Sequence, residues 1–105
     1  AVLNDPNVDI ISLKSVAHQQ LHMHCDEGPT KDARVRRAIA LCLDREKLAA
    51  GLMKGRAAIG NDSPFAPAFP VTDKSLAQRT QDIAKAKQLM EAAGLASGFD
   101  MTLTT

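Results

Sequence analysis

Three aspartates, each followed by apolar residues at helical spacing, most constrain what this chain can fold into. Asp32, Asp44 and Asp82 suit the N-cap position of a helix, because an aspartate carboxylate accepts hydrogen bonds from the free N–H groups of a first turn. The apolar residues behind them recur at intervals of three and four, and they are Val35, Ala38, Ile39 and Cys42, then Leu48, Ala49 and Leu52, then Ile83, Ala86, Leu89, Met90 and Ala93. Gly55 and Gly94 suit the left-handed residues that close helices. The pattern predicts three short helices, the first two of which abut at Asp44.

Three other segments are predicted as strands. Residues 8–11 are rich in β-branched side chains, and residues 18–25 and 99–105 alternate apolar and polar residues, which is the period of a strand with one buried face. Together with the helices they predict an α/β fold, in which the helices pack on a small mixed sheet. The last of these strands would present an exposed sheet edge, and such an edge pairs readily with another chain. We therefore expect a dimer of the isolated chain through its C-terminal strand.

Charge and composition bear on the partners of the chain. Its 105 residues carry a formal net charge of +1, which argues against a general affinity for nucleic acid. The cations near the first helix are Lys31, Arg34, Arg36 and Arg37. Acidic residues interleave with them, and no aromatic residue stands among them to stack on a base. A solvated helix face with local ion pairs therefore explains this cluster better than a helix-turn-helix that binds DNA.

Two nearby histidines are candidate ligands of a metal ion. On a strand, His22 and His24 would share a face, and two imidazoles could bind one zinc or nickel ion. Cys25 would point to the opposite face, so a third ligand is lacking, and structural zinc is almost always four-coordinate. We expect no metal site here, although a histidine-based metal-binding module remains an alternative. Cys25 and Cys42 are too few for a disulfide scaffold, and we interpret both as small buried side chains.

A long connection, residues 57–79, precedes the third helix, and we call it the proline-rich loop. Its clustered prolines are Pro64, Pro67 and Pro70. Three prolines within seven residues exclude a regular helix, and a connection of this length is often functional. Phe65 and Phe69 lie among the prolines, so they are candidates for contact with a ligand. The alternative is that both rings cover the core.

Nothing in the sequence requires catalysis. It holds no G-x-S-x-G elbow, no glycine-rich phosphate loop and no HExxH motif. The paired acids Asp26 and Glu27 stand in a turn signal without a partner base. We therefore expect a protein that is not an enzyme and that needs no cofactor.

Four pieces of the chain, taken in order, carry a family resemblance. They are "VRRAIALCLDR", "SPFAP", "DIAKAKQLMEAAG" and "GFDMTLTT". This order resembles the extracytoplasmic solute-binding proteins of family 5, the peptide- and nickel-type binding proteins of ABC transporters. The likeness runs from about Val2 to Thr105, and its most specific parts are residues 35–45 and 84–94.

The resemblance implies a fold, a function and a place. Residues 1–105 would form a single fragment of the C-terminal lobe, in a type 2 periplasmic-binding-protein-like architecture. The protein would capture a solute, in the first place an oligopeptide, and deliver it to an ABC transporter permease in the membrane. It would work in the periplasm or another extracytoplasmic space. The alternative within the family is a member that binds nickel or a metal chelate.

The resemblance also bears on the binding site. His24 stands where the family usually has Asn, near the hinge, which makes it a third candidate for ligand contact beside Phe65 and Phe69. Members of the family are several times longer and close two lobes on the ligand, so most ligand contacts would come from other segments. We expect the isolated 105-residue chain to bind solute weakly, and the ligand itself does not follow from the family.

Overall fold

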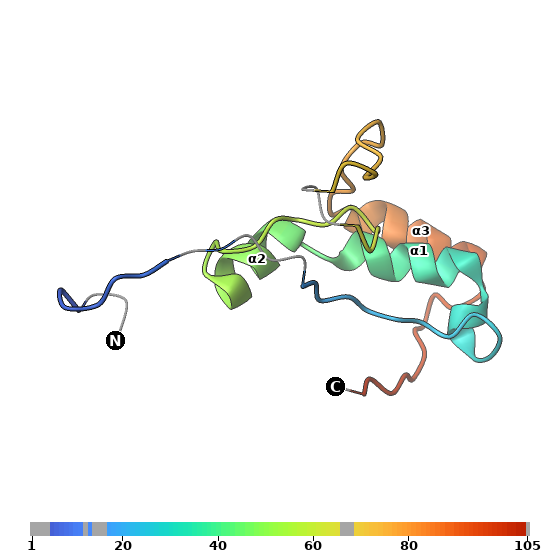
Figure 1. The fold of residues 1–105 in the computed structure, drawn as a ribbon. Coiled ribbons are helices and arrows are strands. Elements are labelled where there is room, and N and C mark those ends of the chain that lie inside the picture. The colour runs from blue at the N-terminus through green and yellow to red at the C-terminus, as the bar shows by residue number, and fades with distance from the viewer. Residues whose placement is uncertain (1–4, 12, 14–16, 66–68, 105) are drawn as a thin grey trace.

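A computed structural model describes residues 5–11, 13, 17–65 and 69–104 of the chain. A short 3₁₀ turn, η2 (Pro29–Lys31), leads into helix α1 (Ala33–Cys42), and helix α2 (Arg45–Met53) follows at once. Helix α3 (Ile83–Ala92) comes after the proline-rich loop and lies alongside α1 (Figure 1). In the part of the chain that the structure describes, no helix has the length and apolar character needed to cross a membrane.

The three predicted helices and their aspartate caps are confirmed. The carboxylates of Asp32, Asp44 and Asp82 accept hydrogen bonds from the backbone N–H groups of Arg34, Lys47 and Lys85, at 2.8, 3.0 and 2.8 Å. Each bond satisfies one of the N–H groups that a helix leaves unpaired in its first turn. The first two helices abut as predicted, with Leu43 alone between the end of α1 and the Asp44 cap.

Helices α1 and α3 are antiparallel and are joined at both ends. At one end, the backbone N–H of Asp82 donates to the carbonyl of Leu41 at 2.9 Å, and the Gln81 side-chain amide donates to the carbonyl of Cys42 at 2.9 Å. These two carbonyls lie in the last turn of α1, where no further helical N–H can reach them. The start of α3 therefore caps the end of α1.

At the other end, an arginine makes the connection. The side chain of Arg34 contacts the Asp32 carboxylate, with 2.5 Å between Nη2 and Oδ2, and its Nη1 donates to the carbonyl of Ala92 at 2.5 Å. The cation thus lies against the C-terminal end of α3, where the helix dipole favours positive charge. Of the basic cluster, Arg34 and Arg36 are thus engaged within the chain, since Arg36 donates to the carbonyls of Thr30 and Lys31 at 2.8 Å each.

The core lies between α1 and α3 and is small. Among the described residues, the buried apolar side chains are Val35, Ala38 and Ala86, with exposures of 0%, 2% and 3%. Two of the three are alanines, which let the two helix backbones approach closely. The predicted stripes of α1 and α3 therefore face each other, as the helical period requires.

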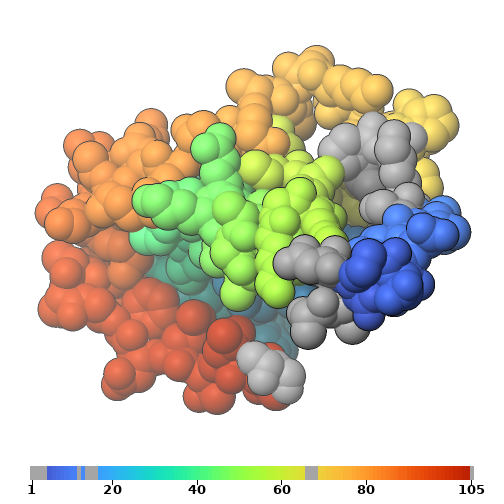
Figure 2. All heavy atoms as spheres, turned by 90° about the vertical axis from the view of Figure 1, so that its left-hand side faces the viewer, coloured from blue at the N-terminus to red at the C-terminus, as the bar shows by residue number. Residues whose placement is uncertain are grey.

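Much apolar surface remains outside this core. The solvent-accessible surface is 8743 Å², about half as much again as the ~5,700 Å² that surface scaling gives for a compact protein of 11.2 kDa. The predicted stripe of α2 is not buried, since Leu48 and Leu52 are 42% and 71% exposed. In the space-filling view, the green residues around α2 stand at the centre of the visible face, between the N-terminal and C-terminal segments (Figure 2).

The predicted α/β fold is wrong for the part of the chain that the structure describes. Helices and irregular segments make up that part, and none of the described residues in 8–11, 18–25 or 99–104 forms a strand. The predicted alternation of apolar and polar residues is present in the sequence. A strand, however, also requires a neighbouring strand that pairs with its N–H and C=O groups, and the described residues of these segments have no such neighbour. The expected dimer rested on the last of these strands and so loses its structural basis; Thr105 lies outside the described residues.

The prediction for the cysteines also fails. Cys25 and Cys42 are free thiols, and both are exposed. The apolar neighbours of Cys25 in the sequence do not pack over it, because the segment forms no sheet. Cys42 lies on the same stripe as the buried Val35 and Ala38, but it is the last residue of α1 and its thiol stays exposed.

We predict that the Asp44 cap controls the stability of α2, because few tertiary contacts support that helix. Asp44→Ala should make amide hydrogen exchange across Arg45–Met53 about fivefold faster, the effect expected for a lost N-cap. Asp44→Asn is the matched control, because its side-chain oxygen can still accept the hydrogen bond from Lys47. Equal exchange in α2 for the wild type and Asp44→Ala would contradict this role.

We also predict an acid-sensitive contact at Asp32. The side chain of Arg34, and then its backbone N–H, lower the pKa of Asp32 from 3.8 to about 2. Because this pKa is lower in the folded chain, the contribution to stability is present above pH 4 and is lost as the pH falls through about 2. Helix content followed by circular dichroism should fall in this window, and Asp32→Asn should flatten that part of the titration. A variant that titrates like the wild type would refute the assignment.

Candidate functional site

The candidate residues of the proline-rich loop lie together. The rings of Phe65 and Phe69 meet edge to face, with centroids 6.4 Å apart and planes at 88°. We call them the aromatic pair. Phe65 remains 51% exposed, and Phe69 is half-buried. Edge-to-face contact is a favoured arrangement of two aromatic rings, so the pair holds its shape while it offers apolar surface to solvent. Pro67 lies outside the described residues.

Local turns hold both members of the aromatic pair. The Ser63 hydroxyl accepts a hydrogen bond from the backbone N–H of Phe65 at 3.2 Å. The carbonyl of Phe69 accepts one from the N–H of Thr72 at 3.2 Å. Pro64 and Pro70 stand beside the rings and restrict the backbone there. These bonds and prolines restrict the backbone at Phe65 and at Phe69.

The third candidate, His24, lies on a different segment. Its side chain is 79% exposed, and its Nδ1 lies 3.5 Å from Oδ1 of Asp26. In the part of the chain that the structure describes, no hydrogen bond or ring contact joins His24 to the aromatic pair. The structure therefore brings Phe65 and Phe69 together but leaves His24 apart from them.

The histidines have separate partners. Nε2 of His22 lies 2.6 Å from the side-chain nitrogen of Gln20, whereas His24 faces Asp26. Over residues 5–11, 13, 17–65 and 69–104, no three His, Cys, Asp or Glu side chains gather closely enough to hold a metal ion. That no metal binds at His22 and His24 stays a prediction.

A charged cluster that the sequence did not indicate stands at the base of the proline-rich loop. The carboxylate of Asp62 contacts two guanidinium groups, those of Arg45 at 2.5 Å and of Arg79. Arg45 also donates from Nη1 to the carbonyl of Arg79 at 3.1 Å. The Arg45 side chain is only 14% exposed. We call these three residues the Asp62 cluster.

Next to the cluster, Asn61 ties the two ends of the loop together. Its side-chain oxygen accepts a hydrogen bond from the backbone N–H of Arg79 at 3.0 Å. Its side-chain nitrogen donates to the carbonyls of Ala77 and Leu76 at 3.0 and 3.3 Å. The side-chain amide of Asn61 thus makes hydrogen bonds to the backbone that a neighbouring strand would otherwise make. The loop is closed at its base by polar side chains.

Two signals in the sequence could have indicated this cluster. Asn61 and Asp62 precede Ser63-Pro64, and Asn and Asp favour turns because they tolerate left-handed backbone. Asp62 indeed has a φ of 54°. Arg45 directly follows an N-cap, so its side chain leaves the first turn of α2 towards the loop. The sequence did not indicate that Asp62 pairs with Arg45 and with Arg79, each of which is 17 residues away from it along the chain. No local pattern contains this information.

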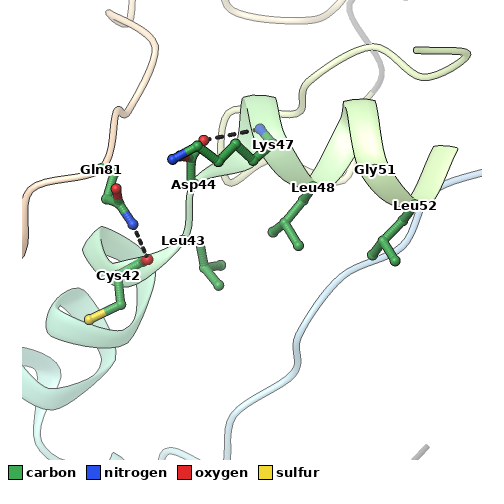
Figure 3. A pocket seen from close by; sticks show the side chains of 8 residues that line it. All are labelled: Cys42, Leu43, Asp44, Lys47, Leu48, Gly51, Leu52 and Gln81. Atoms are coloured by element: carbon green, nitrogen blue, oxygen red, sulfur yellow. Dashed lines mark hydrogen bonds and ion pairs between the residues drawn. The ribbon is translucent and has the colours of Figure 1, made fainter. Parts of the chain in front are cut away.

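A shallow apolar hollow lies where α1 meets α2. Leu43, Leu48 and Leu52 point to the same side (Figure 3). Its polar rim includes the ion pair between Lys47 and Asp44 at 2.9 Å. The backbone N–H of Lys47, and then its side chain, lower the pKa of the Asp44 carboxyl. The hollow is open to solvent and offers mainly apolar surface, with Cys42 and Gln81 also lining it.

The described residues offer a held aromatic pair, a charged cluster and an open hollow. None of these places a nucleophile beside a base, which covalent catalysis requires.

Comparison with known proteins supplies the family. The family described as "Bacterial extracellular solute-binding proteins, family 5 Middle" matches residues 1–105. No curated protein and no solved structure matches the chain. Since the match to the family extends over the whole chain, this chain belongs to the family 5 bacterial extracellular solute-binding proteins.

Proposed function

We propose that this chain is part of the C-terminal lobe of a binding protein that captures an oligopeptide and delivers it to an ABC transporter permease. Family 5 proteins bind solutes for ABC transport and are in general not enzymes, and the match over residues 1–105 is the observation that carries the proposal. The work of such a protein is capture and release, without a bond made or broken. Its place is the periplasm or another extracytoplasmic space.

Within this chain, the proposal assigns ligand contact to the aromatic pair. Phe65 and Phe69 are packed against each other and not among the buried residues of the core. An apolar surface that is already held in shape loses little entropy when a ligand covers it. This supports the ligand reading over the alternative that both rings cover the core.

His24 has a lesser part in the proposal. Its exposed imidazole can donate to or accept from a polar group of a solute, and Asp26 orients it at 3.5 Å. It occupies a position where the family usually has Asn, a residue that also both donates and accepts. We propose His24 as a polar contact from a segment separate from the aromatic pair.

Substitution of the aromatic pair tests the proposal. In the parent protein that contains this chain, Phe65→Ala and Phe69→Ala should each weaken binding of a peptide mixture about tenfold, measured by calorimetry, because each removes an aromatic contact. The unfolding midpoint should change little. Phe99→Ala is the matched control, since it removes the one phenylalanine outside the loop.

The opposite ranking would decide for the other reading. If the two loop variants lose stability and retain affinity, the rings cover the core and the assignment of ligand contact is wrong.

A further inference from the structure

We propose that Asp62 is a positioning residue, which holds the aromatic pair in place by joining Arg45 to Arg79 at the base of the proline-rich loop. The value of this position for ligand capture rests on the function proposed above. The inference itself concerns a cluster that belongs neither to the helix core nor to the aromatic pair.

The Asp62 cluster lies at the base of the proline-rich loop. Asp62 is three residues before Phe65, and Arg79 closes the far end of the same loop. Arg45 stands on α2 and contacts both of them, the carboxylate of Asp62 at 2.5 Å and the carbonyl of Arg79 at 3.1 Å. The loop is thereby attached to a helix and is not closed only upon itself.

The Asp62 cluster has an excess of positive charge. Two guanidinium groups meet one carboxylate, so without Asp62 two cations would face each other beside a largely covered Arg45 side chain. Like charges at short range repel, and the repulsion grows as water is excluded. Loss of the carboxylate should therefore open the base of the loop instead of leaving it as it is.

The backbone conformation of Asp62 also favours this role. Asp62 has a φ of 54°, a left-handed conformation that most side chains avoid and that Asp and Asn tolerate. This conformation turns the chain from Asn61, which binds the far side of the loop, towards Ser63 and Phe65. The turn and the ion pairs therefore act on the same short stretch that aims Phe65.

The composition of the chain permits a direct test. It contains three phenylalanines, no tyrosine and no tryptophan, so few aromatic rings contribute to its NMR spectrum. The edge-to-face contact of the aromatic pair should produce cross-peaks between the rings of Phe65 and Phe69. Methyl signals of Val35, Ala38 and Ala86 report separately on the helix core.

Asp62→Asn is the decisive variant. It removes the charge but keeps a residue that tolerates the left-handed backbone. The ring cross-peaks should disappear, the core methyl signals should stay, and binding of a peptide mixture by the parent protein should weaken about tenfold, since the surface is no longer held in shape. Asp73→Asn is the matched control: it makes the same change of charge in the same loop, where the Asp73 carboxylate accepts hydrogen bonds from Ser75.

Variants of Arg79 test whether the effect of Asp62→Asn comes from the lost ion pairs or only from a local change at position 62. Arg79→Gln should disturb the same two rings, whereas Arg79→Lys, which retains the cation, should restore part of the ring contact. Intact ring cross-peaks in both Asp62→Asn and Arg79→Gln would overturn the inference.

The two proposals fail in different ways. If Asp62→Asn displaces the rings while Phe65→Ala and Phe69→Ala bind peptides normally, the assignment of ligand contact is wrong and the positioning role of Asp62 stands. If the Phe variants lose affinity but Asp62→Asn leaves the rings in place, the positioning role is wrong and the ligand contact stands.

Discussion

The antiparallel contact of α1 and α3 is the constraint on which the rest of the structure depends. Both helices have ten residues, so each end of one lies beside an end of the other. Carbonyls at a helix end have no partner within the helix, and here the partner comes from the neighbouring helix: Asp82 reaches Leu41, and Arg34 reaches Ala92. Because these bonds satisfy groups that would otherwise need water, they fix the helix register that the small apolar contact alone would leave loose.

This contact explains why the Asp62 cluster exists. Arg45 is the third residue after α1, and Arg79 comes shortly before α3, so pairing the two helices brings the two cations to the same end of the pair. The chain between them must leave and return at that point. Asp62 supplies the negative charge that makes the return favourable, and Arg45 bonds to the returning backbone at the carbonyl of Arg79. The loop is therefore closed by electrostatics where the helices end.

The helices could be predicted from the sequence because their signals are local. A cap such as Asp44 and the helix behind it span only a few turns, and the structure has both at the predicted residues, although the apolar stripe of α2 stays exposed. The strands could not be predicted in the same way, because the alternation in residues 18–25 shows only that this sequence is able to form a strand. Whether a neighbour is present depends on distant residues. The same limit hid the contact of Asp62 with Arg45, while Phe65 and Phe69 could be singled out because the prolines around them are a local signal.

The Asp62 cluster matters more for geometry than for stability. The side chains of Asp62 and Arg79 are 39% and 38% exposed, so water and salt screen much of what their ion pair contributes to the free energy of unfolding. Carboxylate–guanidinium contact is nevertheless directional, because the planar fork of an arginine fixes where the acid must lie. In this chain the direction is set twice, once from α2 by Arg45 and once from the end of the loop by Arg79. A change at Asp62 should therefore leave the α1–α3 contact intact and alter the shape of the surface that the loop presents, which is the property that a binding protein depends on.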